Sequence, residues 1–416
     1  MRAIFIAVGS ELLELGRIDT NSIYVSEQLA EHGILTSIKM VVGDDITNLS
    51  WAIKNACKRS QLVVITGGLG PTEDDITRES AAEALKLNLI FKEEIVERIK
   101  TMFKRRGISM PEINTRQAFV IEGAEILENS VGTAPGQYYE KDNCRLLLLP
   151  GPPREMQPMF DRILREKISK LSNFFIYRRN FKFGGLTESE TDSLVAGIYR
   201  KYKNPVTTIL ASPGIIEVHL LGRSKKSIDE AKELTDELSE KIKEKLKDFL
   251  ITEENISIEE FVVKQLINKK LTICTAESCT GGGLGNTLTN VPGSSEVFLG
   301  GFIPYSNKLK SSILKIEEET IKRYGAVSKE VAKKMAENAR IISGADLGIS
   351  VTGIAGPGGG TSKKPVGLVF MHLNTEKKDI SQYKIFPGGR EIVKKRTVNY
   401  CLNMICNYLK DEKNQR

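Results

Sequence analysis

The sequence contains few of the residues that several kinds of functional site require. It has three histidines, and none of them lies in a glycine-rich or acidic motif. This argues against a Ser-His-Asp triad and a histidine-rich metal site, so a nucleophile would need a different base. Six cysteines are too few for a disulfide framework in a chain of 416 residues. The histidines are His32, His219 and His372.

Long apolar runs and a strong charge of one sign are also absent. The longest apolar runs, such as 3–8 and 146–149, are far shorter than the roughly 20 residues of a membrane-spanning helix. No small-residue cleavage site follows the first run, so we expect a cytoplasmic protein without a membrane partner. The net charge is only +7, and acidic and basic residues are interleaved. Such a balance predicts solvated helix faces, and no nucleic-acid partner is expected.

The length of the chain allows two or three domains. In residues 1–168, short apolar stretches alternate with helical ones, which predicts βαβ units around a mostly parallel sheet. Residues 169–252 have a β-α-β-β-α pattern and predict a small α+β, KH-like module. This module lacks a Gly-x-x-Gly loop between helices, so RNA binding is only weakly indicated. Strand-like and helical stretches alternate again over residues 253–416. The predicted class is therefore α/β, with two α/β domains joined by the small module.

The densest motif of the first domain is GGLGPTEDDIT, from Gly67 to Thr77. It follows a buried strand and precedes a helix, so its glycines would let backbone N–H groups approach a phosphate closely. Thr72 and Thr77 can add hydroxyl donors. Asp74 and Asp75 would repel a phosphate unless a divalent cation bridges them to it. A plain strand-to-helix turn with acidic residues near the helix start explains the motif about equally well.

Two further loops are expected to line the same crevice, because ligands of α/β proteins bind at the carboxyl ends of parallel strands. One loop carries Ser10 and Glu11 after the first strand, with Asn21 close behind. The other carries Gly151 and Pro152 after the apolar run at 145–149. Each loop, taken singly, is more often a turn than a binding site.

The second dense motif is TAESCTGG, which begins at Thr275 after a predicted strand. Its serine, Ser278, would have backbone N–H groups nearby that can stabilise an oxyanion. The alternative is an N-cap followed by a close-packing pair of glycines. Cys279 has no nearby histidine to activate it, so we expect a small buried residue.

Segments downstream of this motif supply further candidates. Ser295 lies in PGSS, and Tyr305 and Lys310 lie in YSNKLK. A lysine can serve as a base if burial lowers its pKa, although on composition alone Lys310 would be a surface residue. The TGIAGP segment resembles a backbone anion cradle, and arginines near the C-terminus could hold a phosphate through bidentate contacts. The candidates in these last segments are Gly353, Ala355, Gly356, Arg390 and Arg396.

The first domain resembles the molybdopterin-binding fold family, whose loop reads GGxGxTxxDxT. The matching positions are Gly67, Gly68, Gly70, Thr72, Asp75 and Thr77. The GSE and DTN pieces and the inserted module are closer still to the competence/damage-inducible CinA family. For this domain the resemblance implies hydrolysis of ADP-ribose to AMP and ribose 5-phosphate by a metal-activated water. The metal would be Mg, Mn or Co, held by Asp74 and Asp75.

Residues 260–410 resemble the C-terminal domain of the same family, the nicotinamide mononucleotide deamidases. TAESCTGG, YSNxxK, GIAGPxGG and FPGxR occur in the family's order. The resemblance implies hydrolysis of nicotinamide mononucleotide to nicotinate mononucleotide and ammonia by a serine–lysine mechanism without a metal. The residues carried over are Ser278, Ser295, Tyr305 and Lys310, with Arg390 or Arg396 on the phosphate. Spacing does not decide which serine attacks; Ser295 is slightly preferred, with Ser278 positioning the substrate.

The expected function is therefore a two-headed salvage enzyme for pyridine nucleotides, and the family suggests a homodimer. Both implied substrates are phosphorylated ribosides, so the fusion is chemically coherent. A molybdopterin-binding or adenylylating protein would share the glycine loop but would leave residues 260–410 unexplained. A DNA-associated competence factor is suggested only by the family's name, and the mild charge argues against it.

Overall fold

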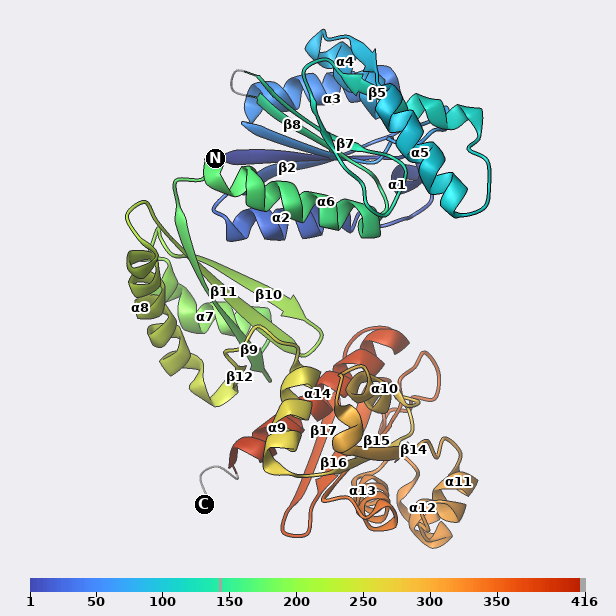
Figure 1. Ribbon diagram of the computed structural model, residues 1–416. Helices are drawn as coiled ribbons and strands as arrows, with labels where there is room; N and C mark the ends of the chain where they lie inside the picture. Colours follow the sequence, from blue (N-terminus) through green and yellow to red (C-terminus); the bar gives the residue numbers. More distant parts are fainter. Residues whose placement is uncertain (142–143, 412–416) are drawn as a thin grey trace. The chain divides into compact units, whose positions relative to one another are not determined.

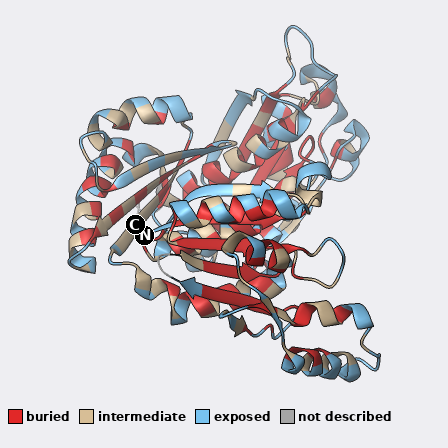
Figure 2. Ribbon diagram, turned by 90° about the horizontal axis from the view of Figure 1, so that it is seen from above, coloured by how far each residue is buried: buried red, intermediate tan, exposed pale blue. Residues whose placement is uncertain are grey.

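The computed structural model describes residues 1–141 and 144–411 (Figure 1). The chain divides into two compact units, Met1–Ile176 with Arg223–Ala231, and Tyr177–Gly222 with Lys232–Arg416. Strands in the middle of the sheets are buried along much of their length, several edge strands are partly or largely exposed, and most helices bury one side only (Figure 2). Within the described ranges, no helix has the length and apolar character needed to cross a membrane. The predicted boundaries at 168 and 252 stay a prediction.

The first unit is built on a six-stranded sheet in the order β2-β1-β3-β8-β7-β6. Its four parallel strands are β2 (Leu35–Val42), β1 (Arg2–Val8), β3 (Leu62–Thr66) and β8 (Cys144–Leu149). The antiparallel edge consists of β7 (Gly136–Lys141) and β6 (Glu125–Leu127). Every residue of β3 is buried, as in a central strand covered on both faces. The predicted α/β class is thereby confirmed.

Helices cover both faces of this sheet. One face carries α2 (Asn21–Glu31) and α6 (Pro153–Glu166), and the other carries α3 (Ile46–Arg59) and α4 (Thr77–Leu85). Because side chains alternate along a strand, Phe5 packs in the first layer and Ile6 in the second. The remaining elements are α1 (Glu11–Glu14), α5 (Glu93–Arg105), β4 (Leu89–Phe91) and β5 (Phe119–Ile121).

The start of α3 differs from the sequence-based expectation. The apolar periodicity suggests a helix from Thr47 with Thr47 as its N-cap, but the helix begins at Ile46. The N-cap is Asp45, whose carboxylate accepts a hydrogen bond of 2.7 Å from the N–H of Asn48. An aspartate is as good a cap as a threonine or better, and the earlier position was open to it.

The small module has the predicted β-α-β-β-α order, followed by a short final strand. Its sheet has the order β10-β11-β9-β12. The elements are β9 (Phe175–Gly184), α7 (Glu188–Tyr199), β10 (Val206–Ser212), β11 (Ile215–Ser224), α8 (Ile228–Leu246) and β12 (Leu250–Thr252). Burial alternates along most of β11, because one face of the sheet packs against the helices.

The C-terminal part of the second unit is a five-stranded sheet in the order β14-β13-β15-β16-β17. The parallel strands are β14 (Phe298–Phe302), β13 (Ile273–Glu277) and β15 (Leu347–Gly353); β16 (Leu368–Asn374) and β17 (Asp379–Ile385) run antiparallel. One face packs against α9 (Ile258–Lys269), α10 (Gly283–Thr289) and α14 (Arg390–Asp411). The other face packs against α13 (Lys329–Ser343). Two short helices, α11 (Asn307–Ser312) and α12 (Glu318–Tyr324), follow β14.

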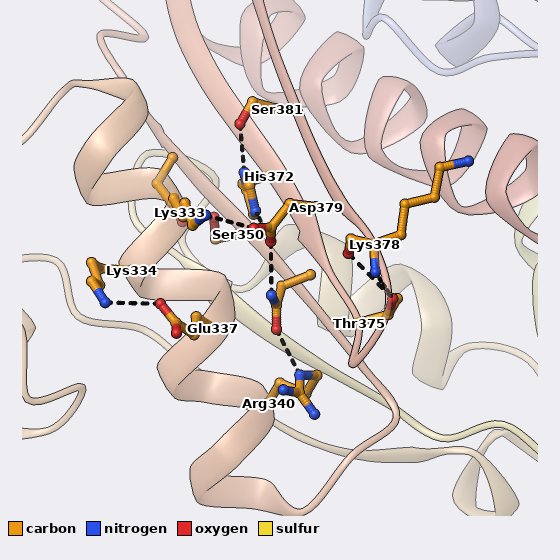
Figure 3. A network of polar contacts seen from close by, with 12 residues as sticks. Lys333, Lys334, Glu337, Arg340, Ser350, His372, Thr375, Lys378, Asp379 and Ser381 are labelled. Atoms are coloured by element: carbon orange, nitrogen blue, oxygen red, sulfur yellow. Dashed lines mark hydrogen bonds and ion pairs between the residues drawn. The ribbon is translucent and has the colours of Figure 1, made fainter.

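A polar network ties the edge strand β17 to β16 and α13 (Figure 3). The ring of buried His372 lies 2.7 Å from Ser381 Oγ and 3.0 Å from Asp379 Oδ1. Asp379 also pairs with Lys333 and accepts a hydrogen bond from Asn374. Burial lowers the pKa of His372, while the contact with Asp379 opposes that shift. Since these contacts link opposing residues of the two strands with α13, they help fix the register of the sheet edge.

Candidate functional sites

Three loops of the first unit converge on one pocket at the carboxyl ends of β1, β3 and β8. Its volume is about 440 Å³, within the range of small-ligand sites. Eight of the residues singled out from the sequence line it: Glu11, Gly67, Gly68, Gly70, Asp74, Asp75, Gly151 and Pro152. The glycine loop, the Ser10 loop and the Gly151 loop therefore share a single cavity.

The carbonyl groups of residues 67–70, the glycine-rich start of the loop, all accept hydrogen bonds from the protein. Thr77 donates to the first two, through Oγ1 to Gly67 at 2.8 Å and through N–H to Gly68 at 3.1 Å. The guanidinium of Arg78 donates to the next two, at 2.7 Å to Leu69 and 2.9 Å to Gly70. Groups of α4 thus bind four consecutive carbonyls. The backbone groups that remain for a ligand in this segment are N–H donors.

The N–H groups of Gly68 and Leu69 have no acceptor within the described parts of the chain. Both residues line the pocket, so these donors are available to an anion. Glycine is required at position 68, because φ is +63° and an added Cβ would lie 2.3 Å from Thr77 Oγ1. The loop therefore has the character of an anion cradle.

Arg78 is the main contributor that sequence reasoning missed. It is 1% exposed, and burial lowers the pKa of its guanidinium. A buried arginine directly after a glycine motif is unusual, because arginine is seldom fully buried without partners. Its partners here are the carbonyls of Leu69 and Gly70, so Arg78 helps to determine the shape of the loop.

The two aspartates predicted to bind a metal have different surroundings. The carboxylate of Asp75 is used inside the loop, accepting from Gly70 N at 2.8 Å, Thr72 N at 2.8 Å and Thr72 Oγ1 at 2.5 Å. Asp74 is exposed and lines the pocket with its carboxylate unengaged by the described chain. Asp75 thus stabilises the loop, and Asp74 is the carboxylate that remains open to a cation.

Two other predicted residues of this domain, Ser10 and Asn21, hold the loops around the pocket through hydrogen bonds. Ser10 and Asp44 exchange two hydrogen bonds, Ser10 N to Asp44 Oδ2 at 2.8 Å and Asp44 N to Ser10 Oγ at 3.0 Å. Asn21 is buried and donates to Gly151 O at 2.7 Å, linking two of the converging loops. Sequence reasoning missed further lining residues, because they carry no motif and come from distant segments. These are Asp44, Gln117, Thr133 and Glu155.

In the second unit, Lys310 and Ser278 are in direct contact. The ammonium Nζ of Lys310 lies 3.2 Å from Ser278 Oγ. Ser278 follows β13, and its N–H donates to Val351 O of the neighbouring strand at 2.9 Å. Lys310 projects from α11, whose N-cap Ser306 accepts from Leu309 N. Residues 32 positions apart are therefore brought together at the carboxyl end of the sheet.

The surroundings of Lys310 suit a base. The residue is 1% exposed, and within the described chain the other hydrogen bonds of its side-chain nitrogen go to the carbonyls of Pro304 and Tyr305, at 2.9 and 3.4 Å. No carboxylate of the described residues forms an ion pair with it. Burial without a counter-charge lowers the pKa of the amine, which increases the share of the neutral form.

Ser295 has a different position. It lies in a short 3-10 turn, Ser294–Glu296, and is exposed. No hydrogen bond within the described chain joins it to Lys310. The slight preference for Ser295 as nucleophile therefore lacks support from the geometry, which places Ser278 beside the base.

The turn after Ser278 presents donors for an oxyanion. The N–H groups of Thr280 and Gly282 have no acceptor in the described part of the chain, whereas Glu277 occupies those of Leu284 and Gly285. Burial raises the pKa of Cys279 to about 12, so its thiol is protonated and unsuited to attack.

Tyr305 and Arg390 form a second contact at this edge of the sheet. Arg390 donates through Nη2 to the Tyr305 hydroxyl at 3.0 Å and through Nη1 to Gly356 O at 2.8 Å. The hydroxyl of Tyr305 therefore binds the arginine, whereas the main-chain carbonyl of Tyr305 accepts a hydrogen bond from Lys310. Hydrogen bonds thus link five of the predicted residues: Ser278, Lys310, Tyr305, Arg390 and Gly356.

Three family models match the chain. The model described as "CinA C-terminal domain" matches residues 255–409, and "Damage-inducible protein CinA KH domain" matches 178–252. The model described as "Probable molybdopterin binding domain" matches residues 4–170. A "CinA-like protein" of Koribacter versatilis is 41% identical over 410 residues, covering 97% of this chain and 99% of the relative. The chain belongs to the CinA family.

Another relative matches over the full length, and two solved structures match part of the chain. A CinA-like protein of Solibacter usitatus is 40% identical over 97% of both chains. The crystal structure of the CinA protein of Thermoplasma acidophilum is 31% identical; it covers 40% of this chain and 98% of its own, with a TM-score of 0.38. A competence/damage-inducible protein from Agrobacterium tumefaciens is 35% identical, covers 38% of this chain and 99% of its own, and has a TM-score of 0.35.

The remaining predicted residues of the CinA C-terminal domain have supporting positions. Gly353 ends β15, where an added Cβ would lie 2.8 Å from Leu368 O. Ala355 is buried in the core that α14 covers. Arg396 is on α14, and its main-chain carbonyl lies near the turn at Gly214 of the small module. A Cβ added at Gly214 would lie 3.8 Å from Arg396 O. These residues shape the surroundings, and none of them contacts Lys310 or Ser278 through a hydrogen bond within the described chain.

Proposed function

We propose that this CinA-family chain is a bifunctional hydrolase of pyridine-nucleotide salvage. The C-terminal site would deamidate nicotinamide mononucleotide, and the N-terminal pocket would hydrolyse ADP-ribose. The observation that carries the proposal is the buried Lys310, which has no ion-pair partner among the described residues and whose Nζ lies 3.2 Å from Ser278 Oγ. A neutral amine beside a serine at a strand end is the arrangement that an amidase without histidine requires.

The proposed deamidation uses Ser278 and Lys310 in turn. Neutral Lys310 accepts the proton of Ser278 Oγ as this oxygen attacks the carboxamide carbon. The N–H groups of Thr280 and Gly282 stabilise the resulting oxyanion. The C–N bond breaks as Lys310 returns the proton to the leaving nitrogen, which releases ammonia. Water then hydrolyses the acyl-serine ester, with Lys310 as base, to give nicotinate mononucleotide.

In the N-terminal pocket the glycine loop would hold the pyrophosphate through the N–H groups of Gly68 and Leu69. The described residues contain no ready-made cluster of three metal ligands. Asp74, with other carboxylates of the lining, nevertheless offers the hard oxygen donors that Mg²⁺ or Mn²⁺ prefers, and the nucleotide can complete the shell. When bound, the cation would neutralise phosphate charge and lower the pKa of a water molecule. The cradle itself orients the anion.

Product analysis of the purified full chain tests both activities. With nicotinamide mononucleotide we expect nicotinate mononucleotide and ammonia; with ADP-ribose we expect AMP and ribose 5-phosphate. EDTA should remove ADP-ribose hydrolysis and leave deamidation unchanged, because only the first site needs a cation. If EDTA affects both reactions or neither, the two-site proposal is wrong. Light scattering on the same sample tests the proposed homodimer.

Substitution of the two aspartates should separate loop stability from cation binding. Asp75→Asn places an NH₂ group against donors of Gly70 and Thr72. We therefore expect the free energy of unfolding to fall by about 1–3 kcal/mol. Thermal unfolding should show a lower melting temperature. Asp74→Asn is the matched control: it should leave the melting temperature unchanged and raise the Mg²⁺ concentration needed for half-maximal ADP-ribose hydrolysis roughly tenfold. Equal melting temperatures for the two variants would contradict the assignment.

A further inference from the structure

The cations around the C-terminal site include one that no motif marks. Gly281 follows the turn of Ser278 and has φ of +65°. An added Cβ there would lie 4.0 Å from Lys394 Nζ. The amine of Lys394 thus reaches from α14 to the loop that carries the proposed nucleophile.

Lys394 lies one helical turn after Arg390 on α14, so the two side chains share a face. Arg390 already contacts Tyr305 and Gly356 at the same sheet edge. Arg396, which the sequence offered as the alternative phosphate ligand, is two positions further along, about 200° around the helix from Lys394. The helix therefore presents Arg390 and Lys394 together, and Arg396 elsewhere.

The charge of Lys394 is not neutralised by any of the residues that the structure describes. It makes no ion pair or hydrogen bond within the described residues, and it is half-buried. The acidic residue at the end of β13, just before this loop, is Glu277, which is buried and already accepts from Leu284 N and Gly285 N. An unpaired cation held beside Arg390 is suited to a dianion.

We infer that Lys394 and Arg390 form the subsite for the substrate's phosphate, and that Lys394 makes the enzyme prefer a nucleotide to the corresponding nucleoside. This inference rests on the proposed amidase function. A phosphate held away from the reacting carbonyl contributes binding that is equal in the ground state and the transition state. Its loss should therefore raise KM and leave kcat nearly unchanged.

The test compares Lys394→Gln with wild type on nicotinamide mononucleotide and on nicotinamide riboside, which lacks the phosphate. We expect KM for the nucleotide to rise about tenfold or more, with kcat unchanged, and KM for the riboside to stay the same. Lys394→Arg should retain most of the affinity, because it keeps the charge. Lys395→Gln removes the same charge from the adjacent exposed position and should behave as wild type. Arg396→Gln should also leave KM nearly unchanged.

Equal losses on both substrates in Lys394→Gln, or a larger effect in Arg396→Gln, would overturn the inference. A calorimetric measurement of ribose 5-phosphate binding, in the presence of EDTA, tests the phosphate subsite independently of the amidase proposal. If wild type shows no deamidation, the proposed function fails, yet weaker binding of this probe to Lys394→Gln would still support the subsite. Unchanged binding in that variant would refute it.

Discussion

Ser278→Ala is expected to reduce deamidation of nicotinamide mononucleotide by at least about 1,000-fold, because loss of a nucleophile removes the covalent route. Ser278 is the hydroxyl in contact with Lys310, at 3.2 Å. Ser278 and alanine differ by one oxygen, so the fold should persist. Steady-state release of ammonia by the purified variant measures the loss, and circular dichroism checks its folding.

Ser295→Ala is the matched control for this experiment. Ser295 is exposed and has no hydrogen bond to Lys310 within the described chain, so we expect a change of no more than about tenfold. Mass spectrometry of rapidly quenched wild type should locate any acyl adduct on the peptide with Ser278. An adduct on Ser295, with Ser278→Ala still forming it, would reverse the roles of the two serines.

Lys310→Arg is expected to be nearly as harmful as Lys310→Ala, with kcat reduced on the order of 100-fold or more. Arginine keeps the positive charge but cannot lose a proton near neutral pH. A merely electrostatic contact would survive this exchange, whereas a general base would not. Substrate affinity should be retained in part, because Arg390 and Lys394 lie outside the dyad. Near-normal turnover of Lys310→Arg would exclude the serine–lysine mechanism.

The same lysine predicts the direction of the pH dependence. Burial lowers the pKa of Lys310, and the neutral amine is the form that accepts the serine proton. The rate of deamidation should therefore rise with pH through this lowered pKa and level off above it. A rate that falls as the lysine loses its proton would show that the charged form is required.

The sequence was sufficient for the architecture because periodicity and motif order record it. The buried run of β3, the helix that begins at Thr77 and the order of strands in the small module are all local patterns. The edge arrangement of β6 and β7 was not predicted, since pairing between distant short strands leaves little trace in the chain. The start of α3 was misplaced because two capping residues compete within three positions.

The sites were predicted less completely, since the geometry depends on distant segments. The motifs contained Ser278 and Lys310, but only the fold shows that these two side chains touch. Asp75 fits a metal ligand by its residue type, yet its hydrogen bonds within the loop assign it another task. Lys394 carries no motif at all, and its place near Gly281 follows from the packing of α14.

The two hydrogen bonds of the Arg78 guanidinium to loop carbonyls have a consequence for how the N-terminal pocket can evolve. Because the guanidinium and Thr77 bind four successive carbonyls, the ligand meets amide hydrogens contributed by the main chain. Exchanges of pocket side chains would leave these main-chain donors in place, and with them the suitability of the loop for an anion. Loss of Arg78 would release two carbonyl oxygens, and a loop free to turn them outward would attract cations. The buried side chain of Arg78 thus helps to keep the loop suited to an anion and not to a cation.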